Sequence, residues 1–375
     1  METTLHQLLS IMVERRASDL HLSCETNPQI RVDGALEPLE QFEPLTSADI
    51  QRLIYGILTE PQRQRFEAGQ DLDLSIDVET LARFRCNVYR QRGVIGAAMR
   101  RIPYTVPSFE ELQLPPVVEQ LTRKQAGLVL VTGPTGSGKS TTLAAMIDKI
   151  NSERRAHIVT IEDPIEFVHR HKKSLVHQRE VMADTPSFRD ALKSIPREDP
   201  DVVLVGEMRD LETIAATLTI AETGHLTFAT LHTRSCAQTI NRIIDVFPTG
   251  QQNQIRAQLS MVLEGVLSQA LVPAASGRGR ALAIEIMLTT PAIRNLIRQE
   301  KIHEIYSMLQ SGGRLGMQTM SQALVSLVSK GKISATEARA RATQPDEVVA
   351  LLGEAVAGAS SSANGHDAKA DLRRR

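Results

Sequence analysis

The sequence predicts an α/β protein of two domains, a small α+β domain over residues 1–102 and an α/β domain over residues 117–353. Three observations lead to this prediction. The chain has 375 residues, which is enough for two or three domains of about 150 residues each. A proline-rich segment at residues 103–116 separates two regions whose hydrophobic patterns differ. Beyond it, short apolar runs alternate with helical stretches, as buried parallel strands do in α/β folds.

The elements of the first domain follow from its hydrophobic spacing. Apolar residues recur at helical intervals from Leu5 to Val13, which predicts an amphipathic helix. A second helix is predicted over residues 45–58, with Thr46 or Ser47 as its N-cap. The predicted strands are residues 18–23, a hairpin at 29–36 that turns at Asp33–Gly34, and paired strands at 71–93.

The second domain is predicted from apolar runs followed by a helical end. The prolines of residues 103–116 remove backbone donors, so we interpret this segment as an interdomain linker. Helical patterns dominate from Pro291 to about Leu352, and the small polar residues 354–375 predict a disordered tail. The predicted strands of this domain are residues 128–132, 157–161, 202–206 and 225–230.

The composition argues against several classes of protein. The net charge is −1 and aromatic residues make up 3%, whereas nucleic-acid binders usually carry a basic field and stacking platforms. No apolar run approaches the roughly 20 residues needed to cross a bilayer, and the N-terminus lacks the pattern of a secretory signal. Cys24, Cys86 and Cys236 match neither a zinc site nor a disulfide framework. We therefore expect no nucleic-acid partner, no membrane span and no zinc.

A glycine-rich motif, GPTGSGKS, directly follows the first predicted strand of the second domain and precedes a helical pattern. It matches G-x-x-x-x-G-K-[ST], in which loop amides and the helix N-terminus cradle phosphates. Lys139 is expected to reach the β- and γ-phosphates of ATP, and Ser140 to ligate Mg²⁺. A glycine-rich surface turn, the alternative, does not account for the flanking strand and helix. The predicted nucleotide-binding residues are Gly133, Pro134, Thr135, Gly136, Ser137, Gly138, Lys139, Ser140 and Thr141.

Acidic residues follow two of the other predicted strands. Glu207 comes directly after one of them, where an acid can hold Mg²⁺ or its water; pairing with Arg209 is the alternative. Glu162, Asp163 and Glu166 follow another, and one of these carboxylates can orient and deprotonate an attacking water. A solvated turn is the alternative for this cluster.

Two histidines, His225 and His232, bracket the last predicted strand, seven residues apart. An imidazole near a γ-phosphate can respond to the charge that hydrolysis creates. A structural role at a strand end is the alternative. We interpret both as functional because all four motifs occur in order along one chain.

These motifs, GPTGSGKS, TIEDPIEF, DPDVVLVGEMRD and GHLTFATLH, resemble the Walker A, Asp box, Walker B and His box of the secretion ATPase superfamily. Within it, AIRNLIR at residues 292–298 is similar to a signature of the type IV pilus retraction ATPases. The similarity runs from about Ser18 to about Leu352. A four-cysteine insert, typical of pilus assembly and type II secretion ATPases, is absent from the sequence.

The resemblance implies a PAS-like N-terminal domain followed by a RecA-like P-loop ATPase domain with a helical C-terminal region. It implies a homohexameric ring that hydrolyses ATP with Mg²⁺ and couples hydrolysis to mechanical work. By position in the motifs, Glu166 is the general base and Glu207 is the Walker B acid and Mg²⁺ ligand. The remaining implied catalytic residues are His225, His232, and two phosphate-reaching arginines of the N-terminal domain, Arg85 and Arg100.

The implied function is retraction of type IV pili, the disassembly that powers twitching motility. The resemblance implies a cytoplasmic ring docked on a platform protein of the inner membrane, with a second retraction ATPase as a possible partner. An accessory retraction ATPase or a type II secretion ATPase remains an alternative. A nucleic-acid translocase is less favoured by the net charge, and a scaffold that barely hydrolyses ATP is disfavoured by the two acids. Arg294 and Arg298 of AIRNLIR form either a partner-facing pair or part of a helix packed on its own domain.

Overall fold

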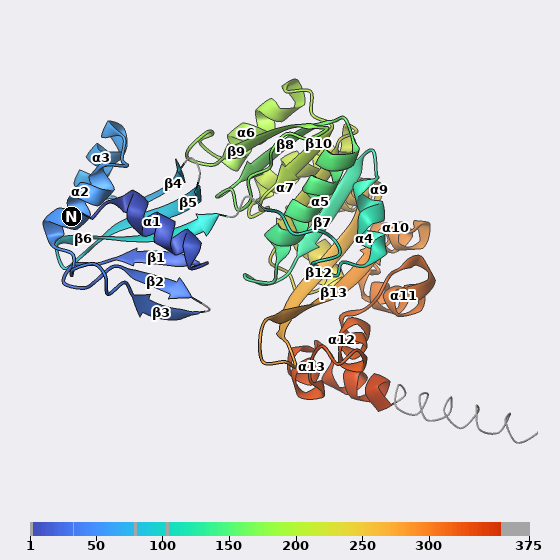
Figure 1. Cartoon of the computed structure of the whole chain (residues 1–375). Coiled ribbons are helices and arrows are strands. Elements are labelled where there is room, and N and C mark those ends of the chain that lie inside the picture. Colours follow the sequence, from blue (N-terminus) through green and yellow to red (C-terminus); the bar gives the residue numbers. More distant parts are fainter. Residues whose placement is uncertain (1–2, 33, 79–80, 103–104, 354–375) are drawn as a thin grey trace, which may run out of the picture. The chain divides into compact units, whose positions relative to one another are not determined.

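The computed structural model describes residues 3–32, 34–78, 81–102 and 105–353, which form two compact units (Figure 1). The first unit extends to Thr105 and includes Glu166–Val168; the second contains Val106–Ile165 and the chain from His169 onward. The predicted tail at residues 354–375 lies outside the described residues. The predicted fold class, a small α+β domain followed by an α/β ATPase-type domain with a helical C-terminal region, is confirmed.

The first unit is built on an antiparallel sheet with the strand order β3-β2-β1-β6-β5-β4. Buried and exposed residues alternate along β5, so one face of this sheet packs against the helices and the other carries polar side chains. Its strands are β1 (Asp19–Leu22), β2 (Gln29–Val32), β3 (Ala35–Pro38), β4 (Leu72–Val78), β5 (Ala82–Gln91) and β6 (Val94–Ile102). Its helices are α1 (Leu5–Glu14), α2 (Ser47–Tyr55) and α3 (Glu60–Glu67).

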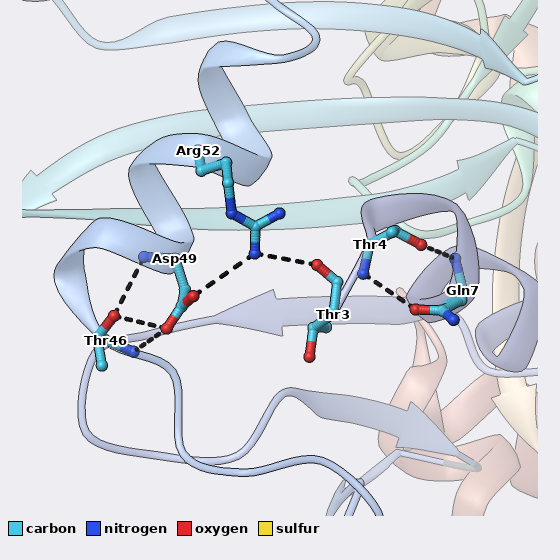
Figure 2. Close-up of polar contacts among 6 residues, drawn as sticks. All are labelled: Thr3, Thr4, Gln7, Thr46, Asp49 and Arg52. Atoms are coloured by element: carbon cyan, nitrogen blue, oxygen red, sulfur yellow. Dashed lines mark hydrogen bonds and ion pairs between the residues drawn. The ribbon is translucent and has the colours of Figure 1, made fainter. Parts of the chain in front are cut away.

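The predicted N-cap of the second helix is confirmed, because α2 begins after Thr46. The Thr46 hydroxyl accepts from the Asp49 amide, and the Asp49 carboxylate accepts from the Thr46 amide (Figure 2). Thr4 caps α1 in the same way. The Arg52 guanidinium donates to the Thr3 carbonyl at 3.1 Å, which links the start of the chain to α2.

The second unit is built on a sheet with the strand order β13-β12-β7-β11-β10-β8-β9. All pairs are parallel except β12–β13. Strands β7, β10 and β11 are buried along their whole length, because helices cover both faces. The strands are β7 (Gly127–Thr132), β8 (His157–Glu162), β9 (Leu175–Glu180), β10 (Val202–Val205), β11 (Leu226–Leu231), β12 (Leu263–Pro273) and β13 (Arg280–Leu288).

Helices α4 and α5 pack on one face of this sheet, and α7, α8 and α9 on the other. The helical end predicted from Pro291 is confirmed by α10 to α13. The helices are α4 (Pro116–Thr122), α5 (Lys139–Glu153), α6 (Phe188–Ser194), α7 (Leu211–Glu222), α8 (Cys236–Asp245), α9 (Thr249–Val262), α10 (Pro291–Arg298), α11 (Ile305–Ser311), α12 (Met320–Ser329) and α13 (Ala335–Arg341). Short 3₁₀ helices lie at Ile195–Arg197, Ile302–Glu304 and Gly312–Leu315.

Candidate functional site

The phosphate loop connects the buried strand β7 to the N-terminus of α5. Gly133 has φ of 141°, and a Cβ there would collide with the Gln269 carbonyl and the Ser137 hydroxyl, so only glycine fits. Gly138, with φ of 88°, ends the loop directly before the helix. The free amides at the start of α5 and its positive dipole end make this loop an anion site. Ser140 and Thr141 lie in the first turn of α5.

The Lys139 ammonium group folds back over the loop. Its Nζ donates to the carbonyl oxygens of Gly133 at 2.8 Å and Pro134 at 3.1 Å, and it lies 3.5 Å from Nδ1 of His232. Lys139 as a residue is only 9% exposed. The charge is therefore held at the place where phosphate oxygens bind in such loops.

Glu207 lies two residues beyond β10, at the same edge of the sheet. The Gly206 amide donates to the Ile161 carbonyl at 2.7 Å, which fixes the backbone just before Glu207. The Glu207 carboxylate pairs with Arg209 at 2.8 Å and with Nε2 of His232 at 3.0 Å. Burial alone would raise the pKa of Glu207, but the hydrogen bond from Arg209 and the charge of His232 outweigh it and lower this pKa.

Lys139, His232 and Glu207 thus form one connected cluster at the carboxyl ends of β7, β11 and β10. Carboxyl ends of neighbouring parallel strands meet at one edge of a sheet, where α/β proteins bind ligands. The pairing with Arg209, the alternative given for Glu207 from the sequence, is present, and the contact with His232 adds a partner that the sequence did not predict. Arg209 was predicted only as an alternative partner of Glu207, although its 62% exposed side chain can also face an anion.

His225 is not part of this cluster. It precedes β11, whereas His232 follows it, and the seven residue steps between them span about 23 Å in an extended strand. Its Nδ1 lies 3.0 Å from the Ile220 carbonyl and 3.1 Å from the Thr223 hydroxyl, at the end of α7. The structure therefore does not bring His225 to the phosphate loop of its own chain.

The three acids after the strand β8 differ in their surroundings. The Glu162 carboxylate accepts from the Thr160 hydroxyl at 2.7 Å and from the Gln178 amide at 3.0 Å. Asp163 and Glu166 are exposed, and no hydrogen bond among the described residues engages Glu166. A carboxylate without a local partner is available to a water or a ligand, which distinguishes Glu166 from Glu162.

Arg85 and Arg100 lie directly opposite each other on β5 and β6 of the first unit. Arg85 forms a two-pronged pair with Asp73 at 2.7 and 3.1 Å, and Arg100 donates to Asp19 at 2.8 Å. Their side chains remain 42% and 70% exposed. Aspartates thus hold two neighbouring guanidinium groups on the polar face of this sheet.

A cavity of about 840 Å³ opens beside the phosphate loop, within the second unit. Gly138 and Thr141 form its wall on the loop side, and the segment before α4 contributes Glu111 and Gln113. Its size is typical of pockets for small organic ligands. The cations on its lining are Arg278, Arg280, Lys330 and Lys332. An anionic ligand with an organic body fits this combination of loop and cavity.

Within the described ranges, no group of three or more His, Cys, Asp or Glu side chains is arranged to hold a metal ion by itself. The same residues contain no helix with the length and apolar character needed to span a bilayer.

Known proteins resemble this chain over nearly all of its length. The family described as "Type II/IV secretion system protein" matches residues 1–341. "Type IV pilus retractation ATPase PilT" of Pseudomonas aeruginosa is 52% identical, covering 91% of this chain and 98% of that protein. "Twitching motility protein" of Neisseria gonorrhoeae is 48% identical, with 86% of each chain covered. The solved structure of the pilus retraction motor PilT with bound ADP has a TM-score of 0.88 at 48% identity, covering 92% of this chain and 99% of that one.

Proposed function

The chain belongs to the type II/IV secretion system protein family, and we propose that it is an ATPase that drives type IV pilus retraction. The similarity to a retraction ATPase over 91% of this chain and 98% of that protein carries this conclusion. The geometry supports the ATPase activity, because Lys139, His232 and Glu207 converge on the edge of a phosphate loop. Phosphoryl transfer needs this kind of positioned charge more than covalent chemistry.

We assign the steps of hydrolysis to residues of this chain. Loop amides and Lys139 bind the β- and γ-phosphates of ATP. Glu166 orients and deprotonates the attacking water, which is consistent with its exposed carboxylate. His232 links the γ-phosphate region to Glu207, so that a change of charge on the phosphates alters a contact that is already made.

The oxygen donors at this edge fit Mg²⁺. Ser140 offers a hydroxyl in the first turn of α5, and Glu207 offers a half-buried carboxylate. Mg²⁺ usually takes one or two protein oxygens and completes its shell with phosphate and water, so these two side chains are a sufficient protein contribution. When bound, Mg²⁺ neutralises charge on the transferring phosphoryl group.

The resemblance assigns Arg85 and Arg100 to phosphate binding, and we carry this assignment to the present chain. This assignment is supported by the positions of the two guanidinium groups, which are exposed and are held by Asp73 and Asp19. The same resemblance assigns the catalytic role of His225, for which the described contacts of this chain offer no support.

The assembled motor follows from the resemblance as well. We propose a homohexamer in the cytoplasm, docked on an inner-membrane platform protein of the pilus machine, with a second retraction ATPase as a possible partner. In this proposal residues 1–102 are the PAS-like domain, 103–116 the linker and 117–353 the RecA-like domain. Leu114 of the linker is buried in the core of the second unit, so at least the end of this segment is fixed to the ATPase domain.

The proposed function is tested by counting surface pili in cells without this gene. We expect more pili and no twitching motility, and we expect the wild-type gene, but not a Lys139→Ala variant, to restore both. Loss of pili would indicate assembly instead. An unchanged number of pili with normal motility would contradict retraction.

A further inference from the structure

A buried carboxylate in β13 binds the first residues of two helices. Glu285 is 3% exposed. One oxygen accepts from the backbone amide of Cys236 at 2.7 Å, and the other accepts from the amide of Met320 at 3.2 Å. Among the described residues, Glu285 has no lysine, arginine or histidine as an ion-pair partner. Burial raises the pKa of Glu285, and the groups that oppose this shift are the backbone amides of Cys236 and Met320 together with the Cys236 thiol.

These two bonds satisfy donors that the ordinary caps do not reach. Ser235 caps α8 by accepting from Gln238, and Thr319 caps α12 by accepting from Gln322. The amides at the first helical positions, Cys236 and Met320, have no partner inside their helices. A carboxylate placed there also lies at the positive ends of two helix dipoles.

The first of these helices controls the turn that carries His232. Helix α8 begins four residues after His232. The Thr239 hydroxyl of α8 lies 2.7 Å from the hydroxyl of Thr233, the residue that follows His232. Thr239 also contacts Thr132, the last residue before the phosphate loop, at 3.5 Å. Helix α8 is thus hydrogen-bonded both to the turn that carries His232 and to the end of β7.

The second helix forms a wall of the cavity beside the phosphate loop. Ala323, Ser326 and Leu327 of α12 line this cavity. The residue two positions before the helix, Gln318, pairs with Ile286 through two backbone hydrogen bonds of 2.9 and 3.2 Å. Helix α12 is therefore docked on β13 immediately beside Glu285.

We propose that Glu285 is a positioning residue of the ATPase site, which holds the His232 turn and the α12 wall of the cavity in a fixed relation. The inference rests on the proposed ATPase function. Through α8, Glu285 acts on the part of the site that binds phosphate. Through α12, it acts on the adjoining cavity, which we expect to hold the organic part of the nucleotide. Glu285 does this without touching nucleotide, because it acts only through the two helix starts.

The test compares steady-state ATP hydrolysis by the purified full-length wild type, Glu285→Gln, His232→Asn and the double variant. A glutamine presents an amide NH₂ to one of the two backbone amides, so one helix loses its partner. We expect Glu285→Gln to lower kcat about tenfold. We expect no further loss of kcat when it is added to His232→Asn, because the α8 contact acts through His232, whereas loss of the α12 contact should raise KM for ATP in both backgrounds. Equal kcat for Glu285→Gln and wild type, or fully additive losses, would overturn the inference.

A second pair of variants removes the donor instead of the acceptor and does not depend on the stability of Glu285→Gln. Cys236→Pro deletes the amide at a helix position where proline is well tolerated, and Cys236→Ala keeps the amide and removes only the thiol. We expect the proline variant to lose kcat about as Glu285→Gln does and the alanine variant to retain it. A larger loss of kcat in Cys236→Ala than in Cys236→Pro would overturn the inference. A wild type that does not hydrolyse ATP would overturn the proposed function and this inference with it.

Discussion

A histidine lies at each end of β11, but the two histidines have different contacts. At the carboxyl end, His232 lies between Lys139 and Glu207, with Nδ1 3.5 Å from the ammonium and Nε2 3.0 Å from the carboxylate. At the amino end, His225 contacts only the end of α7, through the Ile220 carbonyl and the Thr223 hydroxyl. Both histidines belong to one sequence motif, but the topology of the sheet places only His232 beside the phosphate loop of the same chain.

The two edges of the whole sheet differ in the same way as the two ends of β11. The carboxyl edge gathers the phosphate loop, Glu207 and His232 from three parallel strands. The amino edge gathers α10, because Arg294 of this helix pairs with Glu264 at the start of β12. The chemistry and the signature associated with retraction therefore lie at opposite edges of one sheet.

The largest expected effect comes from matched substitutions at the two ends of β10. Glu207→Gln removes the negative charge beside His232 and the carboxylate that we propose as a ligand of Mg²⁺, and we expect it to lower kcat by at least about 100-fold. Asp201→Asn changes the same kind of group at the amino end, where the Asp201 carboxylate accepts from the His157 amide at 2.8 Å. We expect kcat within about threefold of wild type for this control. If Glu207→Gln and Asp201→Asn lowered kcat equally in steady-state ATPase assays, the expected difference between the carboxyl and amino edges of the sheet would be contradicted.

The two histidines test the same division with one substitution. We expect His232→Asn to lower kcat by about tenfold or more, because it breaks the link between Lys139 and Glu207. We expect His225→Asn to stay within about threefold of wild type. If His225→Asn lost as much activity as His232→Asn, a catalytic role of His225 would have to be supplied by something other than the contacts within one chain.

Much of the site was predictable because its signals are local. The phosphate loop is a continuous motif, and Glu207 and His232 each follow a buried strand directly. The role of Glu285 could not be predicted, since β13 and the starts of α8 and α12 come together only in the folded chain. The same limit applies to Arg209, whose exposed side chain had no pattern beyond its closeness to Glu207.

The missed elements of the fold also have physical causes. Strand β12 begins at Leu263 directly after α9 ends at Val262, so no glycine or proline marks the change. Helix α3 buries only Phe66 and therefore lacks an apolar stripe. The strands β6, β9 and β13 were not predicted either, whereas the fully buried parallel strands were, because those read as short continuous apolar runs.

The two arginines of AIRNLIR have different surroundings at the amino edge of the sheet. The Arg294 guanidinium donates to the carbonyls of Ser260 and Met261, both at 2.6 Å, and so caps the end of α9. We expect Arg294→Ala to lower the free energy of unfolding by about 1–2 kcal/mol, measured by denaturant titration. Arg298 is exposed, and the described residues give it no hydrogen bond or ion pair.

We therefore expect Arg298→Ala to leave both stability and ATPase activity near wild type and to abolish twitching motility. Motility that survives Arg298→Ala but not Arg294→Ala would indicate that this helix matters through packing alone. The partner-facing pair considered from the sequence would then be wrong for both arginines.

A third histidine, His169, is expected to affect the pH dependence of stability but not that of catalysis. Burial lowers the pKa of His169 to about 4, with Asp148 opposing the shift and Lys172 adding to it. In the unfolded chain this group titrates near 6.5, so between pH 6.5 and 4 the unfolded state binds the proton that the folded state excludes. The free energy of unfolding should fall as the pH is lowered through this range, by about 1 kcal/mol at pH 5.5. His169→Gln, which stays neutral, should remove this part of the pH dependence and leave the pH profile of kcat unchanged, since the charged groups that affect His169, Asp148 and Lys172, are not part of the cluster formed by Lys139, His232 and Glu207. A kcat profile that shifts with His169→Gln would instead connect this buried histidine to the catalytic site.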